Sequence, residues 1–209
     1  MILTVMNLKG GSTKTTSSAF LAHALAETGH RVLIIDADPQ ASITRWAEMA
    51  EWTIPVRGMA TGRLHVPGVG VDLEAGDYDA VVIDTPPTEK ERGIVESAIR
   101  AATHVLVPLA PSSAEVERMP VVKELIDDLA HLGRHETPPE AAAMFTRTNP
   151  RAVANAEYRE LLESEGWRVL RSHVSQLQRF AQSFGGPIER AAATAYGDAL
   201  TELTGTSIR

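Results

Sequence analysis

Short apolar runs alternate with longer segments of helical period along the whole chain. This alternation predicts βαβ units around a mostly parallel sheet. The apolar runs predict strands at residues 2–6, 31–36, 78–84, 104–109, 142–146 and 168–171. Because most of these runs are apolar at successive positions, we expect helices to cover the strands on both faces.

The segments between the apolar runs predict helices at residues 15–28, 41–51, 91–102, 114–132, 152–165, 176–184 and 191–203. In the first of them, Phe20, Leu21 and Leu25 form an apolar stripe, and Gly29 is a typical helix end. Residues 52–76 are rich in glycine, proline and valine, and they predict an edge strand and a long loop. The length of 209 residues without an interdomain linker favours a single domain, residues 1–209.

Composition and charge exclude several classes of protein. The chain contains no cysteine, which excludes disulfides, iron–sulfur clusters, thiolate zinc sites and cysteine nucleophiles and fits a reducing cytoplasm. The formal net charge of -7 means that any nucleic-acid binding must be confined to a local basic patch. The sequence starts with a strand-like run and lacks an apolar stretch of about 18 residues, so we expect neither a signal peptide nor a membrane span.

The stretch NLKGGSTKTTSS, residues 7–18, connects the first predicted strand to the first predicted helix. A strand, a glycine-containing turn and a helix in this order gather free backbone N–H groups and the positive end of the helix dipole, which favours an anion. Lys14 would add a point charge on the phosphates of a nucleotide, and the Thr15 hydroxyl would ligate Mg²⁺. However, the usual pattern G-x-x-x-x-G-K-[ST] requires glycine where this chain has Leu8 and Thr13. An ordinary strand-to-helix turn is the alternative.

Carboxylates end two other apolar runs. In VLIIDADPQAS, Asp36 and Asp38 are two residues apart, so we expect them to point the same way at the end of a strand that lies next to the first one. The alternative is helix capping by Asp38 ahead of Pro39. In YDAVVIDTPP, Asp84 ends a strand so apolar that a free carboxylate would be unfavourable without a partner. A magnesium-bound water is such a partner, and a turn aspartate is the alternative.

These segments resemble the motifs of the ParA/MinD family of ATPases. KGGSTKTT resembles the deviant Walker A motif K-G-G-x-G-K-[ST]-[ST], DADPQ resembles the Walker A′ segment D-x-D-P-Q, and DTPP resembles the D-x-P-P form of Walker B. HVLVPLAPSSAEVE is similar to the family's strand that ends in P-x-x-P-S. The resemblance covers nearly the whole chain. It implies a P-loop NTPase of α/β class, with a doubly wound, mostly parallel sheet of about six to eight strands and helices on both faces.

The resemblance also implies roles for individual residues. Lys9 would reach across a dimer to the partner's nucleotide, and Asp38 would orient the attacking water. Together with Lys14, these two residues are the implied catalytic residues. Asp36 would belong to the magnesium shell and couple the loops. The residues implied to contact the nucleotide are Lys9, Gly10, Gly11, Ser12, Thr13, Lys14, Thr15, Thr16, Asp36, Arg147 and Asn149, and those implied to hold the metal are Thr15 and Asp84.

Two parts of this implied site are ambiguous. Arg147, Thr148 and Asn149 stand in AMFTRTNPR, where relatives place adenine contacts, and a turn formed by Asn149 and Pro150 is an equally good interpretation. Thr13 takes the place of a glycine, and a β-branched residue there must either avoid positive φ or store strain. We expect a functional phosphate loop with slightly altered backbone geometry.

In its short length and its lack of an N-terminal helix-turn-helix extension, the chain is most similar to small plasmid-partition ParA proteins. The implied activity is slow, Mg²⁺-assisted hydrolysis of ATP to ADP and phosphate. ATP would join two subunits face to face, and a ParB-type centromere-binding protein would stimulate the hydrolysis that separates them. We therefore expect a cytoplasmic, nucleoid-associated DNA partition ATPase that does not bind membranes.

Binding of non-specific DNA requires arginine or lysine contacts to phosphates. The candidates, which we call the arginine group, are Arg168, Arg171, Arg179 and Arg190. Only one acidic residue, Glu189, stands in the same stretch. A merely solvated helix surface is the alternative for this group.

Three other functions are compatible with parts of the sequence. A MinD-like positioning switch would need a basic amphipathic helix at its C-terminus, whereas TAYGDALTELTGTSIR has Arg209 as its single basic residue. A metabolic P-loop enzyme, such as a dethiobiotin-synthetase-like ligase, would not need Lys9. A binding module without hydrolysis would result if Thr13 had damaged the phosphate loop.

Overall fold

One parallel sheet forms the centre of the molecule. The computed structural model describes residues 1–71, 77–149, 154–176, 180 and 182–205. The strands are β1 (Ile2–Val5), β2 (Val32–Asp36), β3 (Val56–Gly58), β4 (Ala80–Asp84), β5 (His104–Leu109), β6 (Glu140–Thr148) and β7 (Val174–Ser175). They lie in the order β3-β2-β4-β1-β5-β6-β7, and each pair of neighbours is parallel. The parallel sheet predicted from the sequence is confirmed.

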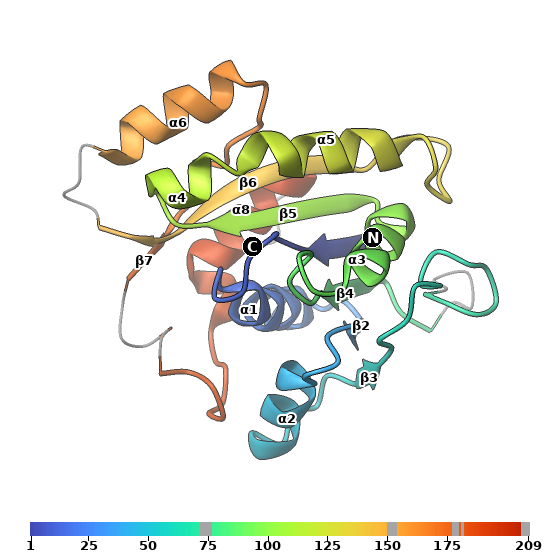
Figure 1. Cartoon of the computed structure of the whole chain (residues 1–209). Coiled ribbons are helices and arrows are strands. Elements are labelled where there is room, and N and C mark those ends of the chain that lie inside the picture. Colours follow the sequence, from blue (N-terminus) through green and yellow to red (C-terminus); the bar gives the residue numbers. More distant parts are fainter. Residues whose placement is uncertain (72–76, 150–153, 177–179, 181, 206–209) are drawn as a thin grey trace.

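Helices cover both faces of this sheet (Figure 1). They are α1 (Lys14–Glu27), α2 (Ser42–Met49), α3 (Arg92–Ala101), α4 (Ser113–Val116), α5 (Met119–Ala130), α6 (Ala154–Ser164), the 3₁₀ turn η1 (Ala191–Ala193) and α8 (Ala195–Thr204). α1 and α8 pack on one face, whereas α3, α5 and α6 pack on the other. None of the helices in the described ranges is both long and apolar enough to cross a bilayer.

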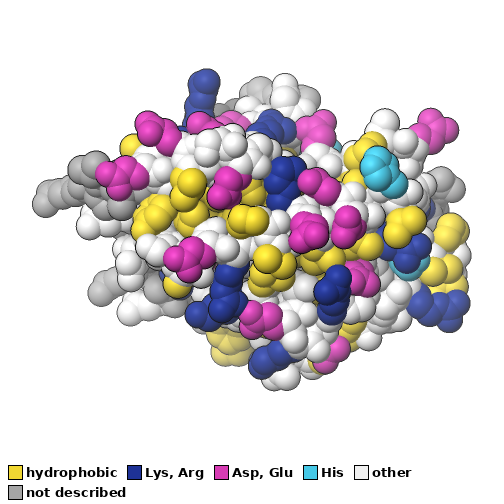
Figure 2. Space-filling model, turned by 45° about the horizontal axis from the view of Figure 1, so that its top comes forward, with side chains coloured by type: hydrophobic (Ala, Val, Ile, Leu, Met, Phe, Trp, Pro, Cys, Tyr) yellow, Lys and Arg dark blue, Asp and Glu magenta, His cyan; other side chains and the backbone are white. Residues whose placement is uncertain are grey.

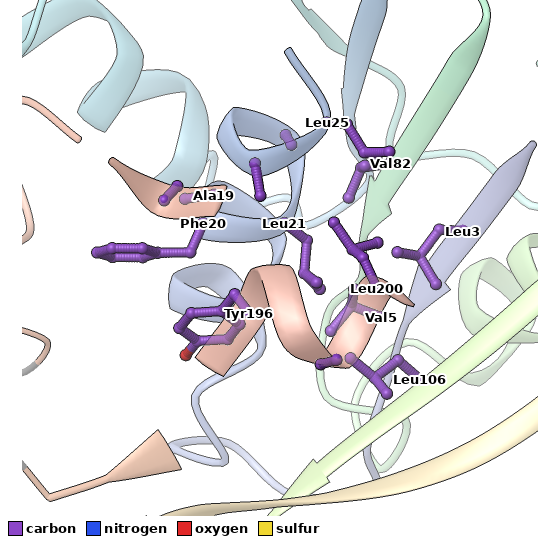
Figure 3. Close-up of a cluster of buried hydrophobic side chains, with 14 of the residues drawn as sticks. Leu3, Val5, Ala19, Phe20, Leu21, Leu25, Val82, Leu106, Tyr196 and Leu200 are labelled. Atoms are coloured by element: carbon purple, nitrogen blue, oxygen red, sulfur yellow. The ribbon is translucent and has the colours of Figure 1, made fainter. Parts of the chain in front are cut away.

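Side chains of the central strands alternate between two apolar cores. Leu3 and Val5 point toward α1 and α8, and Figure 3 shows them with Leu21 and Leu200 in one buried cluster. Ile2 of the same strand belongs to the cluster on the opposite face. Burial on both faces explains why the strands appear in the sequence as continuous apolar runs.

The position of β4 differs from the sequence-based expectation. The strand that carries Asp36 was expected next to the first strand, and this is wrong, because β4 lies between β1 and β2. β4 pairs with both of them, and Asp84 is aligned with Val5 on one side and with Asp36 on the other. The carboxyl ends of three strands therefore meet around Asp84.

Two predicted elements in the second half are divided or shortened. The helix predicted over residues 114–132 is two helices, α4 and α5. Pro120 lies in the first turn of α5, where proline is favoured because its missing N–H is not needed. The strand predicted over residues 168–171 is wrong, since it forms a single bridge between Ala143 and Val169 and β7 completes the sheet instead.

Other boundaries differ in smaller ways. β3 confirms the edge strand predicted within residues 52–76. The helix predicted over residues 191–203 starts as η1, and α8 begins only after Thr194, whose hydroxyl accepts a hydrogen bond from the Tyr196 N–H at 3.2 Å.

Parts of two predicted helices lie outside the described residues. These are residues 152–153 of the helix that becomes α6, and residues 177–179 and 181 of the helix predicted over 176–184. The described residues 182–184 at the end of the latter are not helical.

Candidate nucleotide-binding site

A pocket of about 480 Å³ lies at the carboxyl ends of β1, β2 and β4. Three segments line it, and each follows directly after one of these strands. From the loop after β1 and the first turn of α1, the lining residues are Gly10, Gly11, Thr13, Lys14, Thr15 and Thr16. The structure thus brings most of the predicted phosphate-binding residues to one cavity.

The phosphate loop, residues 9–16, presents free backbone amides at the start of α1. Gly11 has a φ of 77°, a left-handed conformation that glycine adopts readily. The first helical hydrogen bond runs from the Ser17 N–H to the Thr13 carbonyl at 2.9 Å. Since the helix ladder does not use the amides of residues 14–16, these amides and the helix dipole together favour a phosphate group.

Lys14 crosses the inside of this loop. Its Nζ donates a hydrogen bond to the Lys9 carbonyl at 3.0 Å, and the Ser12 hydroxyl donates to the same oxygen at 3.2 Å. Lys14 is buried, which lowers the pKa of its ammonium, while nearby carboxylates, Asp84 foremost, act in the opposite direction. The side chain of Lys9 is exposed at the mouth of the loop.

Asp84 is a fully buried carboxylate beneath the pocket. Its Oδ1 accepts a hydrogen bond from the Ser18 hydroxyl at 2.9 Å, whereas its Oδ2 has no hydrogen-bond partner within the described ranges. Burial raises the pKa of Asp84 to about 7, and the hydrogen bond from the Ser18 hydroxyl and the nearby Thr15 hydroxyl oppose this shift. A buried carboxylate oxygen without a partner, beside the hydroxyl of Thr15, is a donor set that fits Mg²⁺.

Asp36 and Asp38 have different surroundings. Asp38 lines the pocket, and its Oδ1 accepts a hydrogen bond from the Gln40 N–H at 2.9 Å, which forms an Asx turn. Asp36 is buried, which raises its pKa, and it accepts hydrogen bonds from the Thr44 hydroxyl at 2.6 Å and the Asp38 N–H at 3.2 Å. α2 begins only at Ser42, so Asp38 does not cap it. Asp36 therefore ties the turn that carries Asp38 to α2.

The loop after β4 forms a wall that the sequence analysis did not identify. Pro87 and Lys90 line the pocket. The Thr88 N–H donates to the Asn7 carbonyl at 3.3 Å, which joins this wall to the segment just before the phosphate loop. Lys90 stands six residues after Asp84. A basic residue so soon after the predicted Walker B strand is the sequence signal that could have identified this wall of the pocket.

The predicted adenine contacts do not line this pocket. Arg147 has a φ of 55° and forms an ion pair with Glu115. Asn149 is exposed, and its carbonyl accepts a hydrogen bond from the Asn155 side-chain amide at 2.9 Å. Thr148 is buried in β6. The structure places these residues at the end of β6, two strands away from β1.

The described members of the arginine group lie at two places along α8. Arg168 donates a hydrogen bond to the Glu202 carbonyl near the carboxyl end of α8, and the Arg171 N–H donates to the Glu202 carboxylate at 2.7 Å. Arg190 directly precedes η1 and so lies toward the amino end of α8. The 10 residues of α8 span about 15 Å. Arg179 lies outside the described residues.

Basic and acidic side chains are mixed on the face that carries α5 and α6. Figure 2 shows Lys and Arg interspersed with Asp and Glu on this face, with apolar side chains between them. Lys123 and Asp127 form an ion pair of 2.9 Å along α5, and Arg159 and Glu163 form one of 3.7 Å along α6. Among the described side chains of this face, both signs of charge are therefore interspersed.

Residues 3–188 match a family model described as the CobQ/CobB/MinD/ParA nucleotide binding domain. The chain belongs to this family. The family expected from the phosphate loop and the two carboxylate segments is thereby confirmed. The ParA and MinD members are ATPases, and the free amides at the start of α1 agree with a nucleotide-binding protein of this kind.

Individual relatives carry names from two groups. The maintenance of carboxysome distribution protein A of Gloeobacter kilaueensis is 31% identical over 156 residues, which cover 74% of this chain and 67% of that protein. Protein ParA of Rhizobium radiobacter is 27% identical over 165 residues, which cover 75% and 68% of the two chains.

Among solved structures, the ATP complex of a McdA variant from Cyanothece has the same fold. The TM-score is 0.73 at 19% sequence identity, and the match covers 98% of this chain and 96% of the other. This similarity supports the doubly wound P-loop fold described above.

Proposed function

We propose that this protein is a DNA partition ATPase that uses Mg²⁺-ATP to form a face-to-face dimer. The observation that carries the proposal is the convergence of the phosphate loop and Asp38 at one pocket of about 480 Å³, with the buried Asp84 at the end of the adjacent β4. A nucleotide with its metal needs anion-binding amides, a basic side chain, an uncompensated carboxylate and a polar group near the attacking water. All four are present at the ends of three adjacent strands.

Each residue has a distinct task in this proposal. The amides of residues 14–16 and the Lys14 ammonium bind the phosphates. Thr15 and Asp84 hold Mg²⁺, which when bound neutralises charge on the phosphate oxygens. Asp38 reaches the pocket from the turn after β2 and orients the attacking water, and Asp36 holds that turn against α2. Arg147 and Asn149, at the end of β6, are proposed adenine contacts.

The cycle of the protein depends on contacts beyond one subunit. The exposed side chain of Lys9 stands at the mouth of the phosphate loop, where it can reach the nucleotide of a second copy. The ATP-bound dimer then holds non-specific DNA of the nucleoid through basic residues, and a ParB-type centromere-binding protein stimulates hydrolysis and release. The protein acts as a timed switch in the cytoplasm.

The dimer is the feature to test first. In the Asp38→Ala variant the phosphate loop and Asp84 are intact but the water is no longer oriented, so ATP should persist and dimers should accumulate. We expect sedimentation velocity in saturating ATP and MgCl₂ to show a larger dimer fraction than in ADP. Asp127→Ala, which changes an exposed carboxylate on α5, serves as the matched control and should hydrolyse ATP like the wild type. A variant that stays monomeric in saturating ATP would rule out the face-to-face dimer.

A second candidate function is the positioning of a cargo other than DNA. It is favoured by the 31% identity to a protein named for the maintenance of carboxysome distribution. Addition of a cognate centromere-binding protein separates the two candidates. Stimulation of ATP turnover supports partition, whereas an unchanged rate favours another adaptor and cargo. Turnover that instead depends on an added small carboxylic acid would indicate a metabolic ligase.

A further inference from the structure

Thr13 has a backbone conformation that favours glycine. Its φ of 63° and ψ of 18° are left-handed, and a β-branched side chain is strained there. A threonine at the start of a helix often caps the helix through its hydroxyl. The Thr13 side chain makes no capping hydrogen bond, so capping does not explain this residue.

The Thr13 hydroxyl instead connects the phosphate loop to β6. Its Oγ1 lies 3.0 Å from the Thr146 Oγ1 and 2.6 Å from the Ser12 carbonyl oxygen. The Thr13 hydroxyl is the donor in both contacts, so its single proton is shared between the Ser12 carbonyl and the Thr146 hydroxyl. Thr146 is fully buried, and a glycine at position 13 would deprive its hydroxyl of this partner.

Thr146 lies where β6 becomes irregular. The pairing of β6 with β7 shifts its register between Thr146 and Thr148, and Arg147 between them has a positive φ of 55°. The Arg147 guanidinium is held by Glu115. The left-handed residues Thr13 and Arg147 are therefore connected through the buried Thr146.

We infer that Thr13 and Thr146 are positioning residues whose hydrogen bond holds the phosphate loop against β6 in its phosphate-binding shape. This inference rests on the proposed function. A loop that is already held in its bound shape loses less conformational entropy when the ligand binds. Glycine at position 13 would adopt the same φ without strain, but it would leave the loop untethered.

A double-mutant cycle tests this pair. The variants are Thr13→Gly, Thr146→Val and the combination of both, and the measurement is the affinity for ADP in MgCl₂ by isothermal titration calorimetry. We expect Thr146→Val to weaken ADP binding about threefold to tenfold when Thr13 is present, and to have almost no effect in the Thr13→Gly background. Thr13→Ser keeps the hydroxyl and should retain the wild-type affinity.

Thr4→Val is the matched control. Thr4 is also fully buried, but its hydroxyl donates to the Ala98 carbonyl at 2.9 Å and does not touch the phosphate loop. This variant should lower the melting temperature and leave ADP affinity unchanged, which separates positioning from a general loss of stability.

The possible failures are distinguishable. Additive effects of Thr13→Gly and Thr146→Val in a protein that still binds ADP and hydrolyses ATP would overturn the inference and leave the proposed function intact. A wild-type protein that binds no nucleotide would overturn both. If Thr146→Val does not fold, Thr13→Ser and Thr13→Gly decide the matter, because equal ADP affinities of these two variants contradict the tether.

Discussion

The residues of the nucleotide pocket are spread over residues 14–84 and converge at one edge of the sheet, whereas the arginine group lies within residues 168–190 and its described members lie toward both ends of α8. Lys14 and Asp38 follow β1 and β2, Asp84 is the last residue of β4, and these strands end side by side at one edge of the sheet. Arg168 and Arg190 stand within one short stretch, yet they lie toward opposite ends of α8.

This difference shows which sequence signals predict that residues converge in space. In a parallel sheet all carboxyl ends lie at the same edge, so polar residues that follow apolar strands converge whatever their separation along the chain. Residues of one stretch converge only if the local backbone turns back on itself. Among the described residues of the second region, Arg168 lies near the carboxyl end of α8 and Arg190 toward its amino end, and Arg168 is already paired with Glu140 at 3.0 Å.

The largest expected effect is in the pocket. Lys14→Gln removes the buried charge that faces the phosphates, and we expect kcat/KM for ATP to fall about 100-fold or more. Phosphate release measured at several ATP concentrations gives this value. Lys123→Gln is the control, because Lys123 makes only a surface ion pair with Asp127, and its activity should be unchanged. Equal losses in both variants would mean that the pocket has no special role.

Asp84→Asn should separate metal binding from folding. The neutral amide keeps the hydrogen bond from the Ser18 hydroxyl but no longer attracts a cation, so the dependence of ATP affinity on MgCl₂ should be lost. Because a buried carboxylate is replaced, the free energy of unfolding without metal should rise by about 1–3 kcal/mol. Calorimetric titration and urea unfolding measure the two effects. A variant that still needs MgCl₂ for tight binding contradicts the assignment of Asp84 to the metal.

The arginine group can be divided by the salt dependence of DNA binding. Arg190→Gln should flatten the slope of log affinity against log salt concentration by about 1, because one phosphate contact is removed. Arg168→Gln should change this slope less and instead lower the free energy of unfolding by about 1 kcal/mol, since it breaks contacts to Glu140 and to the end of α8. Arg179→Gln is expected to behave like Arg190→Gln. Equal slopes in all three variants would show that the arginines act as one patch.

The smallest expected effect is at the contact between the two regions, where α8 meets α1. Tyr196→Phe removes a long contact of 3.4 Å to the Ser17 hydroxyl but keeps the stacking on Phe20. The free energy of unfolding should therefore fall by only about 0.5–1 kcal/mol at neutral pH. A thermal melt followed by circular dichroism measures this change.

The same variant has a distinct pH dependence. Burial raises the pKa of Tyr196 to about 12 from its ordinary value of 10.0, so the folded state keeps a proton that the unfolded state releases. Stability from this group is present below pH 10.0 and is lost as the pH rises toward 12. We expect the difference in unfolding free energy between the wild type and Tyr196→Phe to shrink as the pH rises from 10.0 to about 12. A difference that stays constant over this pH range would contradict the buried phenol.

Much of the fold could be predicted because it depends on local patterns. The strands at β1, β2, β4 and β5 were found almost to the residue, since an apolar run flanked by polar segments identifies a buried parallel strand. The division of residues 114–132 into two helices was missed even though Pro120 is visible in the sequence. β7 was missed because a strand of two residues is too short to show an alternation of apolar and polar side chains.

The partners of the site residues were harder to predict. Ser18 supports Asp84 from α1, which is distant in sequence from β4, and Thr44 supports Asp36 from α2, the helix that follows β2. A hydroxyl on a helix has many possible partners, and only the packing of that helix selects one.

The sequence by itself determined the phosphate loop, the buried parallel strands and the carboxylates at their ends, because each depends on residues that are neighbours along the chain. The tertiary structure decided that β4 lies between β1 and β2, that Thr13 meets Thr146, and that Arg168 and Arg190 are apart. An apolar strand has the same pattern at any position in a sheet, so the order of strands follows from how the connecting helices pack on the two faces.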